Sequence, residues 1–438
     1  MKKSLSKKPP AERLFVNARI MDPDQGLDMH GDVLVRKGKI AKVGKSISRD
    51  NLKKSTKIID CKNLILTPGL VDCRVFIGEP GGEHRETIKS ASKAAASGGV
   101  TTLVMMPDTS PVIDDVSLVD FVRQTAWEKS RVRILPSAAL SRGLKGEQMT
   151  EIGLLTEAGA IAFTDGRKTV ENAQMMRRAL TYARDFDALI MGAHREPSLG
   201  GGVMNAGLNA TRLGLSGIPR EAEIIPLERD MRLVAMTGGK FHASTVSTSD
   251  SVDVIARSKD RSLNVSAGVA IANLALNETD IGSYRTFYRV SPPLRDESDR
   301  KAVVEGIRNG TIDLICSNHD PHDVDTKRLP FAEAADGAVG LESLLAASLR
   351  LHHTEDIPLM RVLDCLSNQP AKRLGLKCGS LREGRRADMI LVDPDMPWIM
   401  TEDELHSRSK NTAFERARFQ GRVLKTIVAG RTVFSRDH

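Results

Sequence analysis

The chain has 438 residues, of which 40% are apolar and 27% charged, a composition typical of a globular protein too long for one hydrophobic core. Its net charge of +8 does not predict a nucleic-acid partner, because half of that charge lies in residues 1–13 and only 4% of residues are aromatic. The sequence contains no run of about 18 apolar residues, so we predict no membrane span. Five widely spaced cysteines without a CxxC pair exclude a disulfide framework and a thiolate zinc site, and we predict a cytoplasmic protein.

The N-terminal region predicts a tail followed by a small sheet. Residues 1–12 are polar, basic and rich in proline, which is typical of a disordered tail. Short apolar segments separated by Gly and Asp turn signals then predict antiparallel strands. These segments are residues 14–16, 32–35, 39–43 and 58–60. Strand-like segments return at 387–393, 423–428 and 432–434, so we predict that residues 13–66 and 385–438 form one small β-sandwich domain.

The middle of the chain alternates short apolar runs with segments of helix length. The runs lie at residues 64–66 with 70–71, and at 102–106, 132–135, 160–163, 188–191, 263–266 and 314–316. The helix-length segments include 85–97, 118–129, 171–184 and 299–309. Buried parallel strands joined by crossover helices are typical of the α/β class, and this number of units predicts a (β/α)8 TIM-like barrel over residues 67–384.

The first predicted barrel strand carries a recognisable motif. Residues 68–81 read PGLVDCRVFIGEPG and resemble the dihydroorotase signature PGxxDxHxHxRxPG, so the chain is identified as a member of the dihydroorotase family. The resemblance implies an amidohydrolase-type barrel and zinc-dependent hydrolysis of a cyclic amide. The two metal-binding histidines of the family fall at Arg74 and Phe76, and neither side chain can ligate zinc. The arginine that holds the substrate carboxylate falls at Gly78.

The resemblance extends to later segments, and more of the expected site residues are replaced there. Asp108 stands where the family motif MPNT has its asparagine, and a carboxylate would repel an anionic substrate. The segment HASTVST resembles HxxHVST, but it keeps only His242 and has Thr245 at the metal position. The segment SNHDPH resembles TDHAPH, with Asn318 where the family has the metal-binding aspartate that transfers the proton. Asparagine keeps the shape of aspartate but cannot act as a general base.

Two further segments lose polar groups in the same way. The segment AIANL, residues 270–274, stands for the family's TPHHL and lacks both histidines. The segment SPPLR, residues 291–295, stands for NPPLR and places Ser291 where the resemblance implies a substrate-binding asparagine.

A few candidate site residues survive. His194 matches a metal-binding histidine of the family, and Asp165 matches the position of a metal-bridging carboxylate, although a shift of one place leaves that match open. Five residues are predicted to contact a ligand: Arg74, His194, Asn273, His322 and Gly337. A hypothesis for Arg74 follows from its expected burial, because a buried cation needs an anionic neighbour. We expect its guanidinium to replace the metal's charge by pairing with Asp72, Asp165 or Asp320.

Three functions remain open at this point. The first is a non-catalytic dihydroorotase-like protein of de novo pyrimidine biosynthesis without a metal cofactor. The resemblance implies aspartate carbamoyltransferase as its partner and a homo-oligomeric state. The second is an active cyclic amide hydrolase, of dihydroorotase or allantoinase type, with a degenerate or metal-free site built from His194, Asp165, His322 or Cys316. The third is a protein that binds a small anionic ligand in the old pocket through Arg74 and His322.

Overall fold

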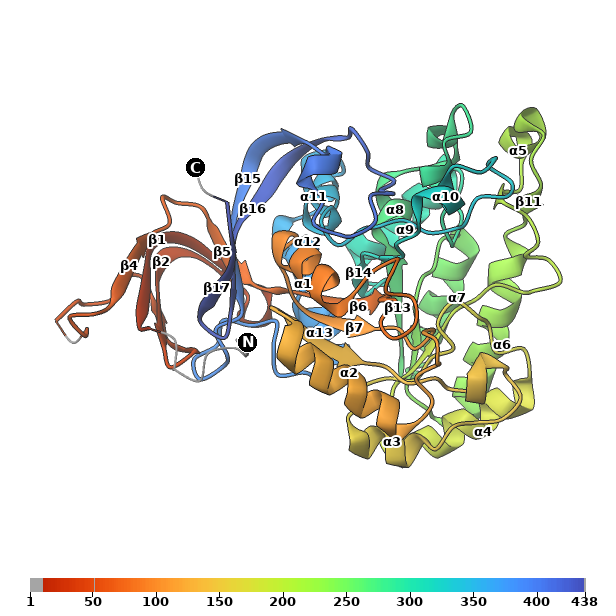
Figure 1. Cartoon of the computed structure of the whole chain (residues 1–438), viewed down its shortest axis with the longest axis horizontal. Coiled ribbons are helices and arrows are strands. Elements are labelled where there is room, and N and C mark those ends of the chain that lie inside the picture. Colours follow the sequence, from red (N-terminus) through yellow and green to blue (C-terminus); the bar gives the residue numbers. More distant parts are fainter. Residues whose placement is uncertain (1–10, 51, 437–438) are drawn as a thin grey trace.

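The computed structural model of the protein describes residues 11–50 and 52–436. Both ends of the chain contribute to one eight-stranded sheet with the order β17-β16-β15-β5-β1-β2-β3, in which β4 pairs with β1. Figure 1 shows the early red strands beside the late blue ones, at one side of the molecule. The strands are β1 (Arg13–Asp22), β2 (Leu27–Arg36), β3 (Lys39–Gly44), β4 (Lys57–Asp60), β5 (Ile65–Pro68), β15 (Met389–Ile399), β16 (Arg418–Val428) and β17 (Arg431–Ser435). The sheet packs around its own apolar core, which includes Phe15, Leu66 and Leu391.

The boundary of the predicted tail differs from the structure. Residues 1–10 lie outside the described residues. Glu12 was placed in the tail, but its side chain is buried and forms an ion pair with Arg36 at 2.7 Å. It also accepts hydrogen bonds from the Lys53 amide and the Thr56 hydroxyl at 3.1 and 2.7 Å. These contacts tie the chain to the sheet before β1 begins, so the tail prediction was wrong for this residue.

Seven short parallel strands and one bridging residue form the barrel. They are β6 (Leu70–Val75), β7 (Val100–Met105), β8 (Arg133–Pro136), β9 (Ile190–Gly192), β12 (Phe241–Ala243), β13 (Val265–Ala270) and β14 (Leu314–Cys316). Phe163 bridges Ala138 after β8 to Ile190 on β9, and Val75 bridges to His319 after β14, which closes the ring. The predicted (β/α)8 barrel is therefore confirmed. Its fourth position is taken by the residues around Phe163, which do not form a regular strand.

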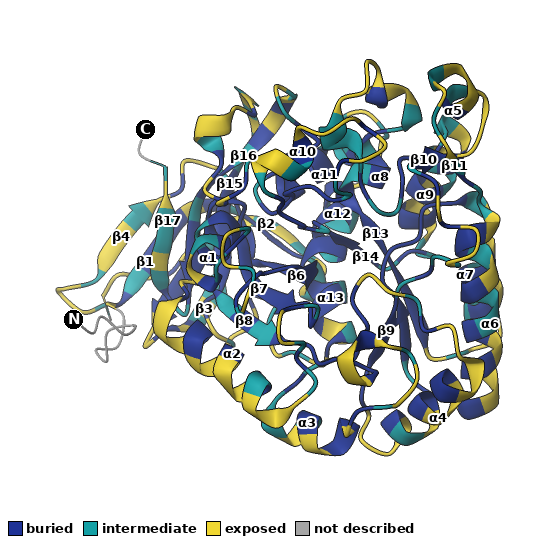
Figure 2. Cartoon of the chain, turned by 45° about the vertical axis from the view of Figure 1, so that its right-hand side comes forward, coloured by how far each residue is buried: buried dark blue, intermediate teal, exposed yellow. Residues whose placement is uncertain are grey.

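Helices surround the barrel and cover its strands. Figure 2 shows dark, buried strands inside and outer helices that are exposed along one side. The helices are α1 (Ile88–Ser97), α2 (Val116–Lys129), α3 (Ile152–Ala158), α4 (Ala173–Arg184), α6 (Glu221–Thr237), α7 (Ser249–Asp260), α8 (Ile271–Ala275), α9 (Glu297–Asn309), α10 (Val324–Lys327), α11 (Leu344–His353), α12 (Leu359–Leu366) and α13 (Asn368–Arg373). A short excursion consists of β10 (Met204–Asn205), α5 (Leu208–Leu213) and β11 (Gly217–Ile218). No described helix combines the length and apolarity needed to cross a membrane.

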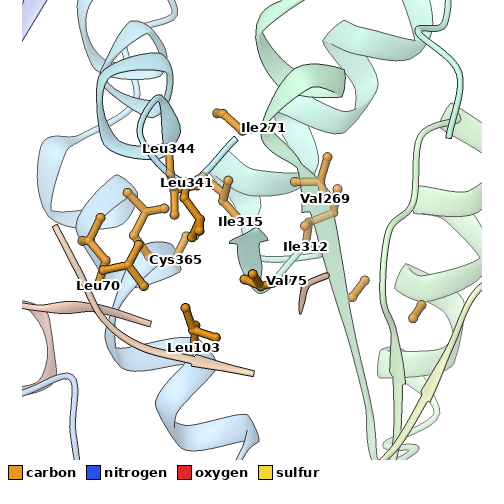
Figure 3. Close-up of a cluster of buried hydrophobic side chains, with 14 of the residues drawn as sticks. Leu70, Val75, Leu103, Val269, Ile271, Ile312, Ile315, Leu341, Leu344 and Cys365 are labelled. Atoms are coloured by element: carbon orange, nitrogen blue, oxygen red, sulfur yellow. The ribbon is translucent and has the colours of Figure 1, made fainter. Parts of the chain in front are cut away.

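The main core holds the barrel strands against their helices. In Figure 3, Leu70 on β6 and Leu103 on β7 lie near Cys365 of α12, while Val269 on β13 lies near Ile312 and Ile315 of the β14 segment. These side chains are at most 1% exposed. Burial of each such side chain stabilises the fold by roughly 1.5–3 kcal/mol. This packing fixes the strand ends from which the candidate site residues project.

Candidate functional site

A small cavity lies where the end of β6 meets the segments that follow β9 and β12. Its volume is about 30 Å³. The lining residues are Arg74, Arg167, Ala193, His194, Arg195, Ile218, Ala222, Glu223, Thr245, Ser291, Pro292, Pro293 and Arg295. The carboxyl ends of barrel strands are where enzymes of this architecture place their reacting groups. Of the predicted site residues, the structure brings Arg74, His194 and Thr245 together at this cavity.

Arg74 lies near the end of β6 and crosses to the segment after β14. Its Nε donates to Oδ1 of Asn318 at 2.9 Å, and its Nη1 donates to the Gly166 carbonyl at 3.2 Å. The Asn318 amide in turn donates to the carbonyl of Ser291 at 2.9 Å. Three positions at which the resemblance implies a metal ligand, a general base and a substrate contact are thus joined in one hydrogen-bonded chain.

The prediction that the guanidinium of Arg74 pairs with a carboxylate is wrong. None of the ion pairs within 4.0 Å among the described residues includes its guanidinium. Asp72 instead accepts the backbone N–H groups of Arg74 and Ser317 at 3.2 and 3.3 Å, and its complete burial raises its pKa to about 6. Asp165 accepts the amide N–H of Ser141 at 2.8 Å and also its hydroxyl, and burial raises the pKa of Asp165. Nearer donors have satisfied both carboxylates.

The third proposed partner, Asp320, belongs to a separate ionic cluster around Phe76. Arg85 lies over the Phe76 ring at 4.1 Å and Arg167 lies at 5.7 Å, within range of a cation–π interaction. Asp320 joins the two arginines, accepting from Arg85 Nη2 at 2.7 Å and from Arg167 Nη1 at 2.8 Å. Burial opposes ionisation of Asp320, but Arg167, His322 and Arg85 outweigh it and hold its pKa well below the usual range. Asp108 pairs with Arg167 at 3.3 Å.

His194 and His242 have different surroundings although both lie in the barrel. The His194 side chain is fully buried beside the cavity, and its Nε2 lies 3.4 Å from Oδ2 of Asp230. Neither ring nitrogen of His194 has a hydrogen-bond partner among the described residues. His242 shares a 2.8 Å hydrogen bond with Oγ of Ser266. Burial, with the charges of Arg373 and Arg74, lowers the pKa of His242 to about 3, so this ring is neutral at pH 7.

Known proteins similar to this chain identify its family. A model described as "Dihydro-orotase-like" matches residues 63–251. A dihydroorotase of Syntrophotalea carbinolica is 38% identical over 422 residues, which cover 96% of this chain and 98% of the relative. A dihydroorotase of Pelobacter propionicus is 39% identical over 97% of this chain and 99% of its own length.

The chain belongs to the dihydroorotase family. Solved structures agree with its fold. The L-hydantoinase (dihydropyrimidinase) of Arthrobacter aurescens superposes with a TM-score of 0.87 at 22% identity, covering 97% of this chain and 96% of that structure. The dihydropyrimidinase of Brevibacillus agri gives a TM-score of 0.83 at 21% identity, with coverage of 97% and 95%.

The zinc site implied by the dihydroorotase family does not fit the residues present here. Among the described residues, no group of three or more His, Cys, Asp or Glu side chains is arranged to hold a metal ion. The guanidinium of Arg74 lacks a free lone pair, and the Phe76 ring is covered by two cations. A hydrolytic zinc site needs about three protein ligands. His194 is the one histidine that lines the cavity in the part of the chain that the structure describes.

The remaining predicted ligand-binding residues do not line the cavity in the described structure. Asn273 donates to the Pro293 carbonyl at 2.8 Å, and His322 Nε2 lies 3.0 Å from the Asp336 carbonyl. Gly337 has a φ of +141°, and a Cβ there would lie 2.6 Å from Oδ2 of Asp320. Glycine is therefore required for the close approach of this backbone. Ligand binding by Asn273, His322 and Gly337 stays a prediction.

Three of the four arginines that line the cavity, Arg167, Arg195 and Arg295, were not among the predicted site residues. Arg195 pairs with Asp336 at 3.1 Å, and Arg295 lies 3.6 Å from Glu223 and donates to Oγ of Ser247 at 3.0 Å. Each arginine stands inside or beside a segment that resembles a family motif. Arg195 directly follows His194, Arg167 follows the Asp165-Gly166 pair, and Arg295 ends SPPLR. Their position next to strand ends was a usable signal.

Proposed function

We propose that this dihydroorotase-like protein of pyrimidine biosynthesis is non-catalytic. The observation that carries the proposal is the 2.9 Å hydrogen bond from Arg74 Nε to Asn318 Oδ1. A fixed cation stands at the position of a metal-binding histidine, and a neutral amide stands at the position of the general base. Loss of a general base alone typically costs 10²- to 10⁴-fold in rate. The mutual hydrogen bond supports a rebuilt site, because each replacement satisfies the other.

The dimensions and charges of the site support the same proposal. The cavity of about 30 Å³ is far smaller than the roughly 300–1,000 Å³ of typical small-molecule sites. The substrate grips of the family are also lost. A Cβ at Gly78 would lie 1.9 Å from the Gly82 carbonyl oxygen, so an arginine cannot be accommodated there without a backbone shift. Asp108 already pairs with Arg167.

We further propose that the chain is a homo-oligomeric, cytoplasmic partner of aspartate carbamoyltransferase. A dihydroorotase-like protein that has lost its chemistry while keeping its shape retains a role in assembly. Three large apolar side chains, each on a different helix, are exposed on the outer surface. Leu208 on α5 is 91% exposed, Trp127 on α2 is 69% exposed and Met236 on α6 is 67% exposed. Aromatic and methionine side chains are enriched in protein interfaces.

The catalytic part of this proposal is tested by metal content and turnover. The purified chain is incubated with zinc, dialysed and assayed for bound zinc and for dihydroorotate hydrolysis, with the Geobacter metallireducens dihydroorotase as the positive control. We expect well below one zinc per chain and no hydrolysis above background. The Asn318→Asp variant restores the family's carboxylate without its metal ligands, and we expect it to remain inactive. Turnover by the unmodified chain would restore the alternative of an active cyclic amide hydrolase.

The partner is tested separately by mixing the chain with aspartate carbamoyltransferase from the same organism. Size-exclusion chromatography with light scattering gives the mass of each protein alone and of the mixture. We expect an oligomer for the chain alone and a single larger species for the mixture. Separate elution of the two proteins at concentrations of tens of micromolar would contradict the partnership and leave the catalytic proposal untouched.

A further inference from the structure

One cation in the cavity lacks a carboxylate partner. Four arginines line this space, and three of them pair with an acidic side chain. These pairs are Arg167 with Asp320 at 2.8 Å, Arg195 with Asp336 at 3.1 Å and Arg295 with Glu223 at 3.6 Å. The fourth is Arg74, for which the described residues provide only neutral acceptors, namely Asn318, Gly166 and the sulfur of Met106. The cavity therefore holds one positive charge that the protein itself does not balance.

Burial makes this unbalanced charge costly. Arg74 is only 6% exposed, so bulk water solvates its guanidinium poorly. Removing a charge from water is strongly unfavourable unless a counter-charge and hydrogen bonds compensate for it. Because the neighbouring carboxylates Asp72, Asp165 and Asp320 are already engaged by other donors, the counter-charge has to come from solution.

Two polar side chains beside Arg74 also have unused hydrogen-bonding capacity. His194 lines the cavity with a fully buried side chain. Its Nε2 lies 3.4 Å from Oδ2 of Asp230, but neither ring nitrogen is hydrogen-bonded within the described structure. Thr245 is 5% exposed and lines the same space, and its hydroxyl makes no hydrogen bond to any described residue. Buried polar groups normally have partners, so the unbonded ring nitrogens of His194 indicate a missing one.

The size and shape of the cavity restrict what the missing partner can be. A volume of about 30 Å³ holds roughly two to three water-sized groups. A guanidinium is planar and pairs best with planar oxyanions. We propose that this cavity binds a small planar oxyanion, of the carboxylate or bicarbonate type, on Arg74 with His194 and Thr245 beside it. The inference goes beyond the proposed function, because it requires neither a partner protein nor the absence of turnover.

The proposal is tested by titration with ¹³C-formate and with ¹³C-bicarbonate at constant ionic strength, followed by NMR line broadening. Bicarbonate represents the free ion, and formate represents the carboxylate of a larger molecule. We expect saturable binding of both, and weaker binding of inorganic phosphate, measured by competition, because tetrahedral phosphate exceeds the space available. An absence of saturable binding would overturn the proposal, and tighter binding of phosphate would overturn the choice of a planar ion.

Variants assign the binding to this cavity. Arg74→Met removes the charge and keeps much of the volume, so we expect formate binding to weaken at least tenfold. Arg373→Met is the matched control, because Arg373 donates to Asn264 at the opposite end of the barrel and should leave binding unchanged. Equal binding by Arg74→Met and the unmodified chain would overturn the proposal. Arg74→Lys keeps the charge without the planar fork and should weaken formate binding several-fold, so it decides the question if Arg74→Met does not fold.

Discussion

The two sides of the barrel mouth have replaced the dihydroorotase site in different ways. On the side of β6 and β14, a buried carboxylate joins two arginines across the ring of Phe76. On the side of β9 and β12, a family-type histidine and a threonine line a cavity, and the ring nitrogens of the histidine have no hydrogen-bond partner in the described structure. On the first side Asp320 pairs with Arg85 and Arg167, whereas the second side keeps polar groups without partners among the described residues.

The two sides therefore differ in what surrounds the positions of the family's metal ligands. A metal ion brings positive charge and fixes several side chains at once. On the first side, Arg74, Arg85 and Arg167 now provide positive charge, and Asp320 holds two of them in place. On the second side, Thr245 stands at the position of a family metal ligand as a small, uncharged side chain that lines the cavity. We therefore expect substitutions on the first side to affect stability more strongly.

The largest effect is expected for Asp320→Asn. Removal of one partner from a buried charge cluster typically costs about 3–5 kcal/mol, because the remaining charges lose their compensation. We expect the free energy of unfolding in urea at pH 7 to fall by about 3 kcal/mol, since Arg167 is partly exposed. The pKa of Asp320 is lowered in the folded state, so its stabilisation is present above the ordinary value near 4 and is lost as the pH falls below it.

The matched control for this substitution lies in the sheet domain. Asp28 pairs with Arg19 at 2.8 Å, but both side chains are about 40% exposed. Exposed pairs contribute roughly 0–1 kcal/mol, so Asp28→Asn should lower the free energy of unfolding by less than about 1 kcal/mol. Equal losses for Asp320→Asn and Asp28→Asn would contradict the structural importance of the cluster around Phe76.

Much of the fold could be predicted from the sequence, because buried parallel strands appear as short apolar runs. The runs at residues 102–106 and 314–316 correspond to β7 and β14. The run at 160–163 pairs with its neighbours through Phe163 alone, a detail that an apolar pattern does not contain. The excursion formed by β10, α5 and β11 was not predicted, because strands of two residues have no measurable periodicity.

The candidate site could be located but its contacts could not be predicted. The motifs placed Arg74, Phe76 and Asn318 at strand ends, and the structure has them there. The expected carboxylate partner of Arg74 was wrong, because local backbone donors had already engaged the nearest acids. Its actual partner, Asn318, is 244 positions away in the chain. Only the closure of the barrel brings the two replacements together.

The next prediction concerns His242, which lies on β12. Its pKa is about 3 in the folded state against an ordinary value of 6.5, so the unfolded chain binds a proton first as the pH falls. Its contribution to stability is therefore complete above pH 6.5 and is lost as the pH falls toward 3. Between pH 7 and pH 4.5 the unmodified chain should lose about 2–3 kcal/mol more free energy of unfolding than His242→Asn. Parallel losses in urea unfolding of the two proteins would contradict a buried, neutral His242.

The smallest effect is expected for Thr245→Val on the second side of the mouth. The substitution keeps the shape of the side chain and removes a hydroxyl that has no partner among the described residues, so the free energy of unfolding should change by less than about 0.5 kcal/mol. Thr150→Val is the matched control, because the buried Thr150 hydroxyl donates to the Ala139 carbonyl at 2.7 Å. Its loss should cost about 1–2 kcal/mol in the same urea experiment. Equal destabilisation by Thr245→Val and Thr150→Val would mean that the Thr245 hydroxyl makes a hydrogen bond that the structure does not contain. The two sides of the mouth would then differ only in the ionic cluster around Phe76.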